Sequence, residues 1–469
     1  MRLRNFAVSL LCLAAGTAGA QAGNPGKSPE LRIDYTQETL PNGLTVIYHV
    51  DHSTPVAAVL LWYNVGSKME QPGRTGFAHL FEHMMFKGSK NVADGQHWAL
   101  LEGAGGRAGA DINGTTNWDR TNYFEQVPSN QVELALWLEA DRMGTLLETL
   151  TKEKLDNQRE VVKNERRQGV DNQPYGTWVE KTGELVFPDS HPYHHSVIGS
   201  MADLSAASVA DVQNFFKTYY APNNAVLVIA GDIDVPQVKA MVRKYFGPIP
   251  RGPVPPKLAN MGVPTTIGRE QRVVVQDALA PAPRVFVAYR VPPAKDRRAP
   301  AVSLLSTIIG GGNSSRLDES LVRKQEIATS VTAFNFGLAD GADMLVLYAT
   351  GKPGSSPDSL ERALLAELAG LSTFTQSELE RARAAARFSF VNGLQTTGGF
   401  GGRADLLAEG WTFFRDPNYV NTVLSQIDRV RLSDLDALAR ERLVPANRVI
   451  LVYVPAKKTA SQTSSTRMP

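Results

Sequence analysis

The stretch "VADVQNFFKTYYAPNNAVLVIAGDI", residues 209–233, occurs a second time later in the chain in altered form. The second copy is "LSDLDALARERLVPANRVILVYVP", residues 432–455, and the two copies align without a gap at a separation of 223 positions. Each copy is typical of a helix, a proline that ends the helix, and an apolar strand. We interpret the repeat as an internal duplication. The alternative is that two generic helix-to-strand units resemble each other by chance.

The segment between the two copies indicates how the duplicated parts are joined. Residues 246–265, "FGPIPRGPVPPKLANMGVPT", are rich in proline, which removes backbone donors and fixes an extended path. We therefore predict an N-terminal domain over residues 31–247, a Pro-rich linker over 248–265 and a homologous second domain over 266–456. The last residues, 457–469, have no apolar pattern, and we expect them to be disordered.

The N-terminus, "MRLRNFAVSLLCLAAGTAGAQAG", has the layout of a secretory signal peptide. Arg2 and Arg4 precede a short apolar run, and small residues then offer cleavage sites near Ala20 or Ala22. We predict a signal peptide over residues 1–22 and a periplasmic or secreted mature protein. A buried N-terminal helix is the alternative. The single cysteine, Cys12, lies inside this segment, so the mature chain has no thiol to offer to a metal.

Net charge and composition exclude several partner classes. The chain of 469 residues is 43% hydrophobic and carries a formal net charge of +2, both units of which lie in the predicted signal peptide. No later stretch forms a dense basic patch or a long apolar run. We therefore expect no nucleic-acid partner and no membrane span in the mature chain.

A candidate metal site lies in "GFAHLFEHMMFKGS", residues 76–89. In a helix, His79 and His83 project from one face a turn apart and can offer two nitrogens to one ion. Glu82 lies beside them and can take a proton from a water molecule that the metal acidifies. We predict a zinc site with Glu82 as the general base. The alternative is a pair of core histidines next to a surface glutamate.

A catalytic zinc ion usually has three protein ligands, so a third ligand must come from elsewhere. The segment "KLDNQREVVKNERRQG", residues 154–169, offers Glu160 and Glu165 on different faces of a helix. Glu165 shares the side that carries two valines, where a carboxylate needs a partner, and we predict that it is the third ligand. The rival donor is "HPYHH", residues 191–195, which we expect to be a loop that packs near the site.

The two motifs together resemble the inverzincin metallopeptidases of the pitrilysin and insulinase family. "HLFEHMMFKGS" and "QREVVKNERR" carry the resemblance, which covers roughly residues 31–456 and the layout of short two-domain members such as mitochondrial processing peptidase subunits. It implies ligands at His79, His83 and Glu165 and a base at Glu82. It also implies an α+β fold of two homologous domains, each an antiparallel sheet packed with helices. Gln158 stands where the family often has a second acidic residue.

The resemblance also implies how a substrate binds. Substrates of such enzymes add as a strand to a sheet edge beside the zinc. The matching edge here is "ADINGTTN", residues 110–117, from which we predict substrate contacts by four residues: Asn113, Gly114, Thr115 and Thr116. A plain surface hairpin is the alternative.

The family's second domain often supplies an arginine and a tyrosine that hold the substrate. The matching positions here carry Val322 and Thr329. Either Arg323 serves through a small shift of register, or a homologous partner subunit supplies both residues, which is the interpretation we favour. A homodimer is the alternative assembly.

The resemblance therefore predicts a zinc metalloendopeptidase with one Zn²⁺ per chain, acting on peptides or unfolded polypeptide segments. It predicts the catalytic subunit of a dimer. The alternative is a non-catalytic scaffold or peptide-binding subunit on the same fold.

Overall fold

The computed structural model describes residues 31–456. The predicted signal peptide and the predicted disordered tail, residues 457–469, lie outside the described residues. All the described helices and strands belong to one compact unit that begins at Ile33. Within residues 31–456, none of the helices has both the length and the apolar character that crossing a membrane requires.

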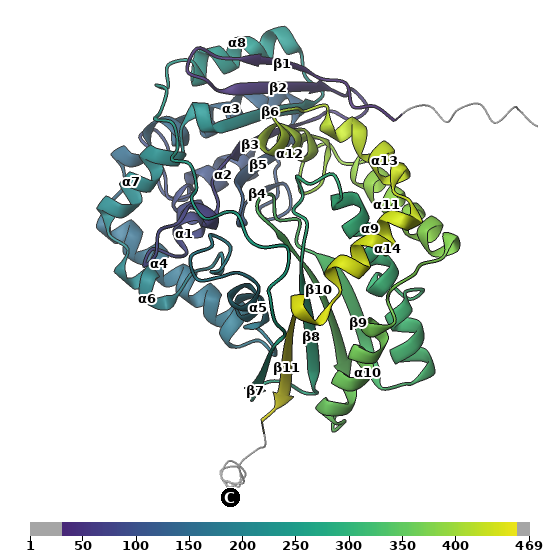
Figure 1. Cartoon of the computed structure of the whole chain (residues 1–469). Helices are drawn as coiled ribbons and strands as arrows, with labels where there is room; N and C mark the ends of the chain where they lie inside the picture. Colours follow the sequence, from purple (N-terminus) through teal and green to yellow (C-terminus); the bar gives the residue numbers. More distant parts are fainter. Residues whose placement is uncertain (1–30, 457–469) are drawn as a thin grey trace, which may run out of the picture. The chain divides into compact units, whose positions relative to one another are not determined.

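The first half of the chain forms a six-stranded sheet (Figure 1). Its strand order is β1-β2-β6-β3-β5-β4, and only β2 and β6 run parallel. Strand β4 lies at an edge. The strands are β1 (Thr36–Thr39), β2 (Thr45–Val50), β3 (Val56–Tyr63), β4 (Ile112–Thr116), β5 (Thr121–Pro128) and β6 (Ala225–Gly231).

Seven helices contribute to the core on one face of this sheet. The alternate residues of β3 that point this way, from Ala57 to Tyr63, are fully buried against them. The helices are α1 (Phe77–Met84), α2 (Gln96–Gly103), α3 (Val132–Thr145), α4 (Lys152–Arg166), α6 (Met201–Ala206), α7 (Val209–Tyr219) and α8 (Val235–Phe246).

The second half repeats this plan with five strands in the order β7-β11-β8-β10-β9. Here β7 and β11 form the one parallel pair, as β2 and β6 do in the first half. The strands are β7 (Gln271–Asp277), β8 (Arg284–Val291), β9 (Ala328–Asn335), β10 (Asp343–Gly351) and β11 (Arg448–Pro455). The helices of its core are α9 (Ala299–Gly310), α10 (Pro357–Ala369), α11 (Gln376–Gly393), α13 (Tyr419–Arg429) and α14 (Leu432–Arg442).

The two halves exchange one helix each (Figure 1). Helix α5 (Trp178–Val186) packs on β8 and β11 of the second sheet, where Trp178 stacks on Phe286 with the rings 5.0 Å apart. Helix α12 (Arg403–Phe414) packs on β3 and β6 of the first sheet through Leu407. The other face of each sheet is therefore covered by a helix that belongs to the other half of the sequence.

The sequence repeat corresponds to one structural unit in each half. Helix α7, the 3₁₀ turn Pro222–Asn224 and β6 recur as α14, the turn Pro445–Asn447 and β11. The buried side chains of Asn224 and Asn447 make the same bond in both copies, because each amide donates at 2.8 Å to the carbonyl oxygen at the end of the preceding helix. The predicted α+β fold of two homologous halves is confirmed, with the addition of one parallel strand pair in each sheet.

Candidate active site

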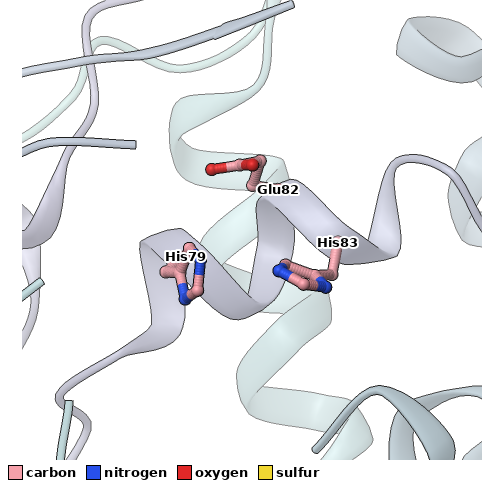
Figure 2. Close-up of side chains that lie close together, drawn as sticks. All are labelled: His79, Glu82 and His83. Carbon is pink, nitrogen blue, oxygen red and sulfur yellow. The ribbon is translucent and has the colours of Figure 1, made fainter. Parts of the chain in front are cut away.

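Helix α1 has an apolar side in the core and a polar side that faces a cavity. His79, Glu82 and His83 all project from α1 (Figure 2). The helix begins after Gly76, whose φ of +87° is left-handed. A Cβ at this position would lie 2.7 Å from the Ile198 carbonyl oxygen, so only glycine allows the chain to enter the helix here. The buried side consists of Phe77, Ala78, Leu80, Phe81 and Met84.

Helix α4 packs against α1 and brings Glu165 to the two histidines. The Oε1 atom of Glu165 lies 3.6 Å from His79 Nε2, and its Oε2 atom lies 3.3 Å from His83 Nε2. Two ligands bound to zinc at about 2.1 Å in tetrahedral geometry are roughly 3.4 Å apart. Two imidazole nitrogens, each at such a separation from one oxygen of the same carboxylate, fit the ligand set of a catalytic zinc ion.

The sequence predicted that Glu165 lies on the buried side of α4, but it reaches the histidines from an exposed side of this helix. Its side chain is 48% exposed, and Val161 one turn earlier is 40% exposed, so neither lies on the buried side of α4. Both residues line the cavity, whereas the core side of the helix carries Leu155 and Val162. Glu160 lies away from the cavity wall, 60% exposed and paired with Lys163 at 2.8 Å.

Glu82 is held by the edge strand β4. Thr116 Oγ1 donates a hydrogen bond to Glu82 Oε2 at 2.7 Å. Gly114 permits this approach, since a Cβ there would lie 3.2 Å from Glu82 Cγ and 3.0 Å from the ring of Tyr123. Burial raises the pKa of Glu82, and the hydrogen bond from Thr116 opposes that rise. A carboxylate with a raised pKa is suited to accepting a proton near neutral pH.

Burial and the neighbouring charges shift the pKa values of the two histidines in opposite directions. Burial lowers the pKa of His79 to about 4, with help from His83 and against the attraction of Glu165. Burial also lowers the pKa of His83, but its hydrogen bond to Glu165 and the charge of Glu82 outweigh burial and raise it overall. The hydrogen bond from His83 in turn lowers the pKa of Glu165. His79 is therefore neutral at pH 7, as a metal ligand must be.

A cavity of about 740 Å³ surrounds these groups, and β4 forms part of its wall. The four predicted substrate-binding residues all line it: Asn113, Gly114, Thr115 and Thr116. The Gly114 amide donates to the Asn113 side chain at 2.8 Å. The structure thus brings every predicted site residue to one cavity, with a sheet edge beside it.

Comparison with known proteins shows to which family the chain belongs. A family model described as "Insulinase (Peptidase family M16)" matches residues 45–181, and one described as "Peptidase M16 inactive domain" matches residues 206–386. The zinc protease PqqE of Helicobacter pylori is 30% identical over 414 residues, which cover 86% of this chain and 89% of that protein. The chain belongs to peptidase family M16, the insulinase family. The predicted family is thereby confirmed.

Solved structures of M16-like proteins share this architecture. The crystal structure of a protease from Helicobacter pylori superposes with a TM-score of 0.83 at 28% identity and covers 90% of this chain and 100% of that one. The first half of the periplasmic protease PqqL from Escherichia coli gives a TM-score of 0.72 at 19% identity and covers 91% of this chain and 93% of that one. At that identity the second likeness shows the fold alone.

The second half of this M16 chain keeps the fold and lacks the ligand side chains. Helices α1 and α9 align at a separation of 224 positions: Leu80 and Leu304 are both fully buried or nearly so, and Gly88 and Gly312 both have a positive φ. At this separation the positions of His79, Glu82 and His83 are occupied by Ser303, Ser306 and Thr307. At these three aligned positions, only the first half carries groups that could bind a metal ion.

The positions where M16 relatives were expected to hold the substrate carry no such group. Val322 packs against the second core. Thr329 lies on the edge strand β9, where its hydroxyl donates to the Thr350 carbonyl oxygen at 3.2 Å. Arg323 is exposed and paired with Asp318 at 2.9 Å. Val322 and Thr329 therefore offer neither a guanidinium group nor a phenol at the two matching positions.

Several residues of the site were not predicted as functional. Gln158 is buried, lines the cavity and forms a hydrogen bond with His83 that raises the pKa of that histidine. Phe86 and Trp98 stack with ring centroids 4.6 Å apart and form an aromatic part of the wall. Phe86 lies three residues after His83, and that spacing is a signal that places it near the metal ligands.

The rival donor "HPYHH" lies apart from the three proposed ligands. His191 Nε2 lies 3.1 Å from the Met261 carbonyl oxygen, and His194 Nδ1 lies 2.9 Å from the Phe187 carbonyl oxygen. His195 contacts a buried glutamate, Glu70, which is bonded to the beginning of α1. The loop packs near the site and binds to its scaffold.

Proposed function

We propose that this protein is a zinc-dependent endopeptidase whose ligands are His79, His83 and Glu165, with one zinc ion per chain and Glu82 as the general base. The observation that carries the proposal is the convergence of both histidine Nε2 atoms on the Glu165 carboxylate at 3.3 and 3.6 Å. A ligand atom of Glu82 also lies within 4.8 Å of both histidines. Because Thr116 engages one oxygen of the Glu82 carboxylate, we assign Glu82 the role of the base beside the metal rather than that of a ligand.

The residues of the chain divide the chemistry between them. Zinc bound to the three ligands would polarise the scissile carbonyl group and make a water molecule more acidic. Glu82 accepts the proton of the attacking water and then returns it to the leaving amine. Thr116 keeps the carboxylate aimed at that position during both transfers.

The edge strand β4 supports binding of an extended substrate. A peptide that pairs with β4 would take the Gly114 amide from the Asn113 side chain, to which it now donates. Gly114 and Thr116 line the same face of the strand as Glu82, whereas Thr115 points to the other side, where its hydroxyl contacts Asn122. Main-chain pairing of this kind accepts many sequences, as cleavage of peptides or unfolded segments requires.

A homologous partner subunit that carries the arginine and the tyrosine would complete the substrate grip. The support is that, among residues 31–456, the two positions expected to carry the arginine and the tyrosine carry Val322 and Thr329 instead. The purified chain should then cleave peptides slowly and accelerate when the partner is added. Full activity of the isolated chain would exclude this requirement.

We further propose that the protein acts in the periplasm or outside the cell after removal of residues 1–22. The predicted signal peptide supports this location. N-terminal sequencing of the mature protein tests it, with an expected start after Ala20 or Ala22. A mature protein that retains Arg2 and Arg4 would contradict it.

The decisive experiment compares the wild-type protein with Glu82→Gln. Both should hold about one zinc ion per chain, because Glu82 is not a ligand, whereas the variant should lose peptide cleavage by at least about a hundredfold. A non-catalytic scaffold of the same fold would hold zinc without cleavage in either form. A Glu82→Gln protein that still cleaves, or that has lost zinc, would contradict the role of Glu82.

A further inference from the structure

A short connection in the first half contacts both helices that carry the proposed metal ligands. This connection, residues 195–207, follows α5 and contains α6, and we term it the strap. The strap begins at the last histidine of "HPYHH", a motif that the proposed chemistry does not use. Its contacts indicate a role in the geometry of the site.

The strap is bonded to the start of α1 through Glu70. His195 Nε2 lies 3.0 Å from Glu70 Oε2, and the Glu70 side chain has no solvent exposure. The same carboxylate accepts from the Gly76 amide at 2.8 Å and from the Ala78 amide at 2.7 Å, which are among the first amides of α1. Glu70 thereby fixes the end of the helix from which His79 projects.

The backbones of the strap and α1 are also in direct contact. Gly76 and Gly199 both have a positive φ, and a Cβ on Gly199 would overlap the backbone of Gly76. Ser200 N donates to Thr75 Oγ1 at 3.1 Å just before the helix begins. Movement of the strap toward α1 would therefore cause backbone overlap, and movement away from α1 would break the bond from Ser200 to Thr75.

The strap is bonded to the end of α4 through Arg166. This residue follows the proposed ligand Glu165, and its Nη1 donates to the Gly199 carbonyl oxygen at 2.9 Å. Arg166 also forms a two-point ion pair with Glu180, whose Oε1 accepts from Ser196 Oγ at 2.8 Å. One short segment thus binds α1 at its start and α4 at its end.

We propose that Glu70 and Arg166 are positioning residues that, through the strap, set the separation of α1 and α4 and hence the distance between Glu165 and the two histidines. The inference rests on the proposed function, since it concerns how the three ligands are held for zinc. Metal–ligand distances tolerate errors of only about 0.2 Å, and two separate helices meet that demand only when they are joined rigidly.

The internal repeat provides a comparison within the same chain. Helices α4 and α11 align at a separation of 224, with Thr151 and Thr375 as their N-caps. Arg159 on α4 donates to two carbonyl oxygens of the strap, and its counterpart Arg383 on α11 donates to two carbonyl oxygens at the equivalent places. This anchor occurs in both halves and therefore belongs to the fold.

Glu70 and Arg166 behave differently from that anchor. At the same separation of 224 positions, the second half has Ala294 in place of Glu70 and Phe390 in place of Arg166, and it has Ser389 in place of the ligand Glu165. The two strap contacts therefore occur only in the half that carries the ligands. This pattern separates residues that position the site from residues that maintain the fold.

The test measures zinc affinity by competition with a chromophoric chelator, together with the thermal midpoint of the metal-free protein and kcat and KM for a peptide. The variants are Glu70→Gln and Arg166→Gln, and the matched control is Arg383→Gln, which removes an arginine anchor in the half without the proposed ligands. Loss of an outer partner of a metal site typically weakens metal binding by about 10- to 100-fold. We expect a loss of about tenfold in zinc affinity and a lower kcat with unchanged KM for the two strap variants.

The control should lower the thermal midpoint and leave zinc affinity near that of the wild-type protein. If both strap variants bind zinc as tightly as the wild-type protein does, or if the control weakens zinc binding equally, the inference is wrong. Arg166→Gln keeps the comparison available if Glu70→Gln does not fold, because the Arg166 side chain is partly exposed whereas that of Glu70 is fully buried. Failure of the proposed function itself is recognised separately, because wild-type protein and His79→Ala would then show the same zinc binding.

Discussion

Replacement of Thr116 by valine tests whether the hydrogen bond to Glu82 contributes to catalysis. Valine has the shape of threonine and favours a strand equally well, so β4 should be unchanged. The variant removes the 2.7 Å bond from Thr116 Oγ1 to Glu82 Oε2. The neighbouring hydroxyl of Thr121 keeps its own bond to the Val65 carbonyl oxygen at 2.9 Å.

The size of the effect follows from this bond. A hydrogen bond to a charged group contributes about 1.5–3 kcal/mol, and the lower figure applies here because Glu82 lines a cavity from which water can replace the hydroxyl. About 1.4 kcal/mol corresponds to a tenfold change in rate. We therefore expect kcat to fall about tenfold in Thr116→Val. KM should be unchanged, because the substrate pairs with the main chain of β4.

The assay is steady-state cleavage of a quenched fluorescent peptide, with zinc content measured in each sample. Thr116→Ser restores the hydroxyl and should restore kcat. Equal kcat values for Thr116→Val and the wild-type protein would refute the assigned role, as would failure of Thr116→Ser to restore kcat.

Three further outcomes are expected. The hydrogen bond from Arg316 holds the pKa of Glu378 at about 2, below its ordinary value of 4.5. Because the folded-state pKa is the lower one, this pair stabilises the protein above about pH 4.5. It ceases to do so as the pH falls toward 2. Arg316→Gln should thus cost about 1 kcal/mol at pH 7 and almost nothing near pH 2, as measured by urea unfolding. Leu407→Ala on α12 should lower the free energy of unfolding by about 3 kcal/mol, because this side chain is fully buried on the sheet of the other half; a loss below about 1 kcal/mol would contradict that packing. Removal of zinc with a chelator should abolish cleavage and lower the thermal midpoint, since a ligand at a hundred times its Kd stabilises by about 2.7 kcal/mol; an unchanged midpoint and activity would exclude a zinc site.

Much of the fold could be predicted because it is repeated. The aligned prolines of the two helix–strand copies are signals read within a few residues, and both copies form the expected units. The parallel pairing of β2 with β6 and of β7 with β11 was not predicted. Such pairs join strands far apart in the sequence, and strand patterning carries no information about which distant strand will be the neighbour.

The same distinction between local and long-range features applies to the site. His79, Glu82 and His83 share one turn of helix, so their geometry relative to one another is a property of the helix and follows from the sequence alone. Glu165 was predicted as the third ligand from an argument about a buried face, whereas the structure shows an exposed face that lines a cavity. The bond from Thr116 to Glu82 and the interaction between His83 and Gln158 depend on how β4 and α4 pack against α1.

The sequence by itself determined which chemical groups this protein can present: two imidazoles and a carboxylate on one helix, an acidic candidate on a second, and two copies of one folding unit. Only the tertiary structure decided that the carboxylate of Glu165 meets the histidines, that α5 and α12 each cover the other half's sheet, and that the strap joins α1 to α4. The reason is physical. Local spacing fixes directions within one helix, whereas separations between elements result from packing and hydrogen bonding over the whole chain, to which residues as distant as Glu70 and His195 contribute.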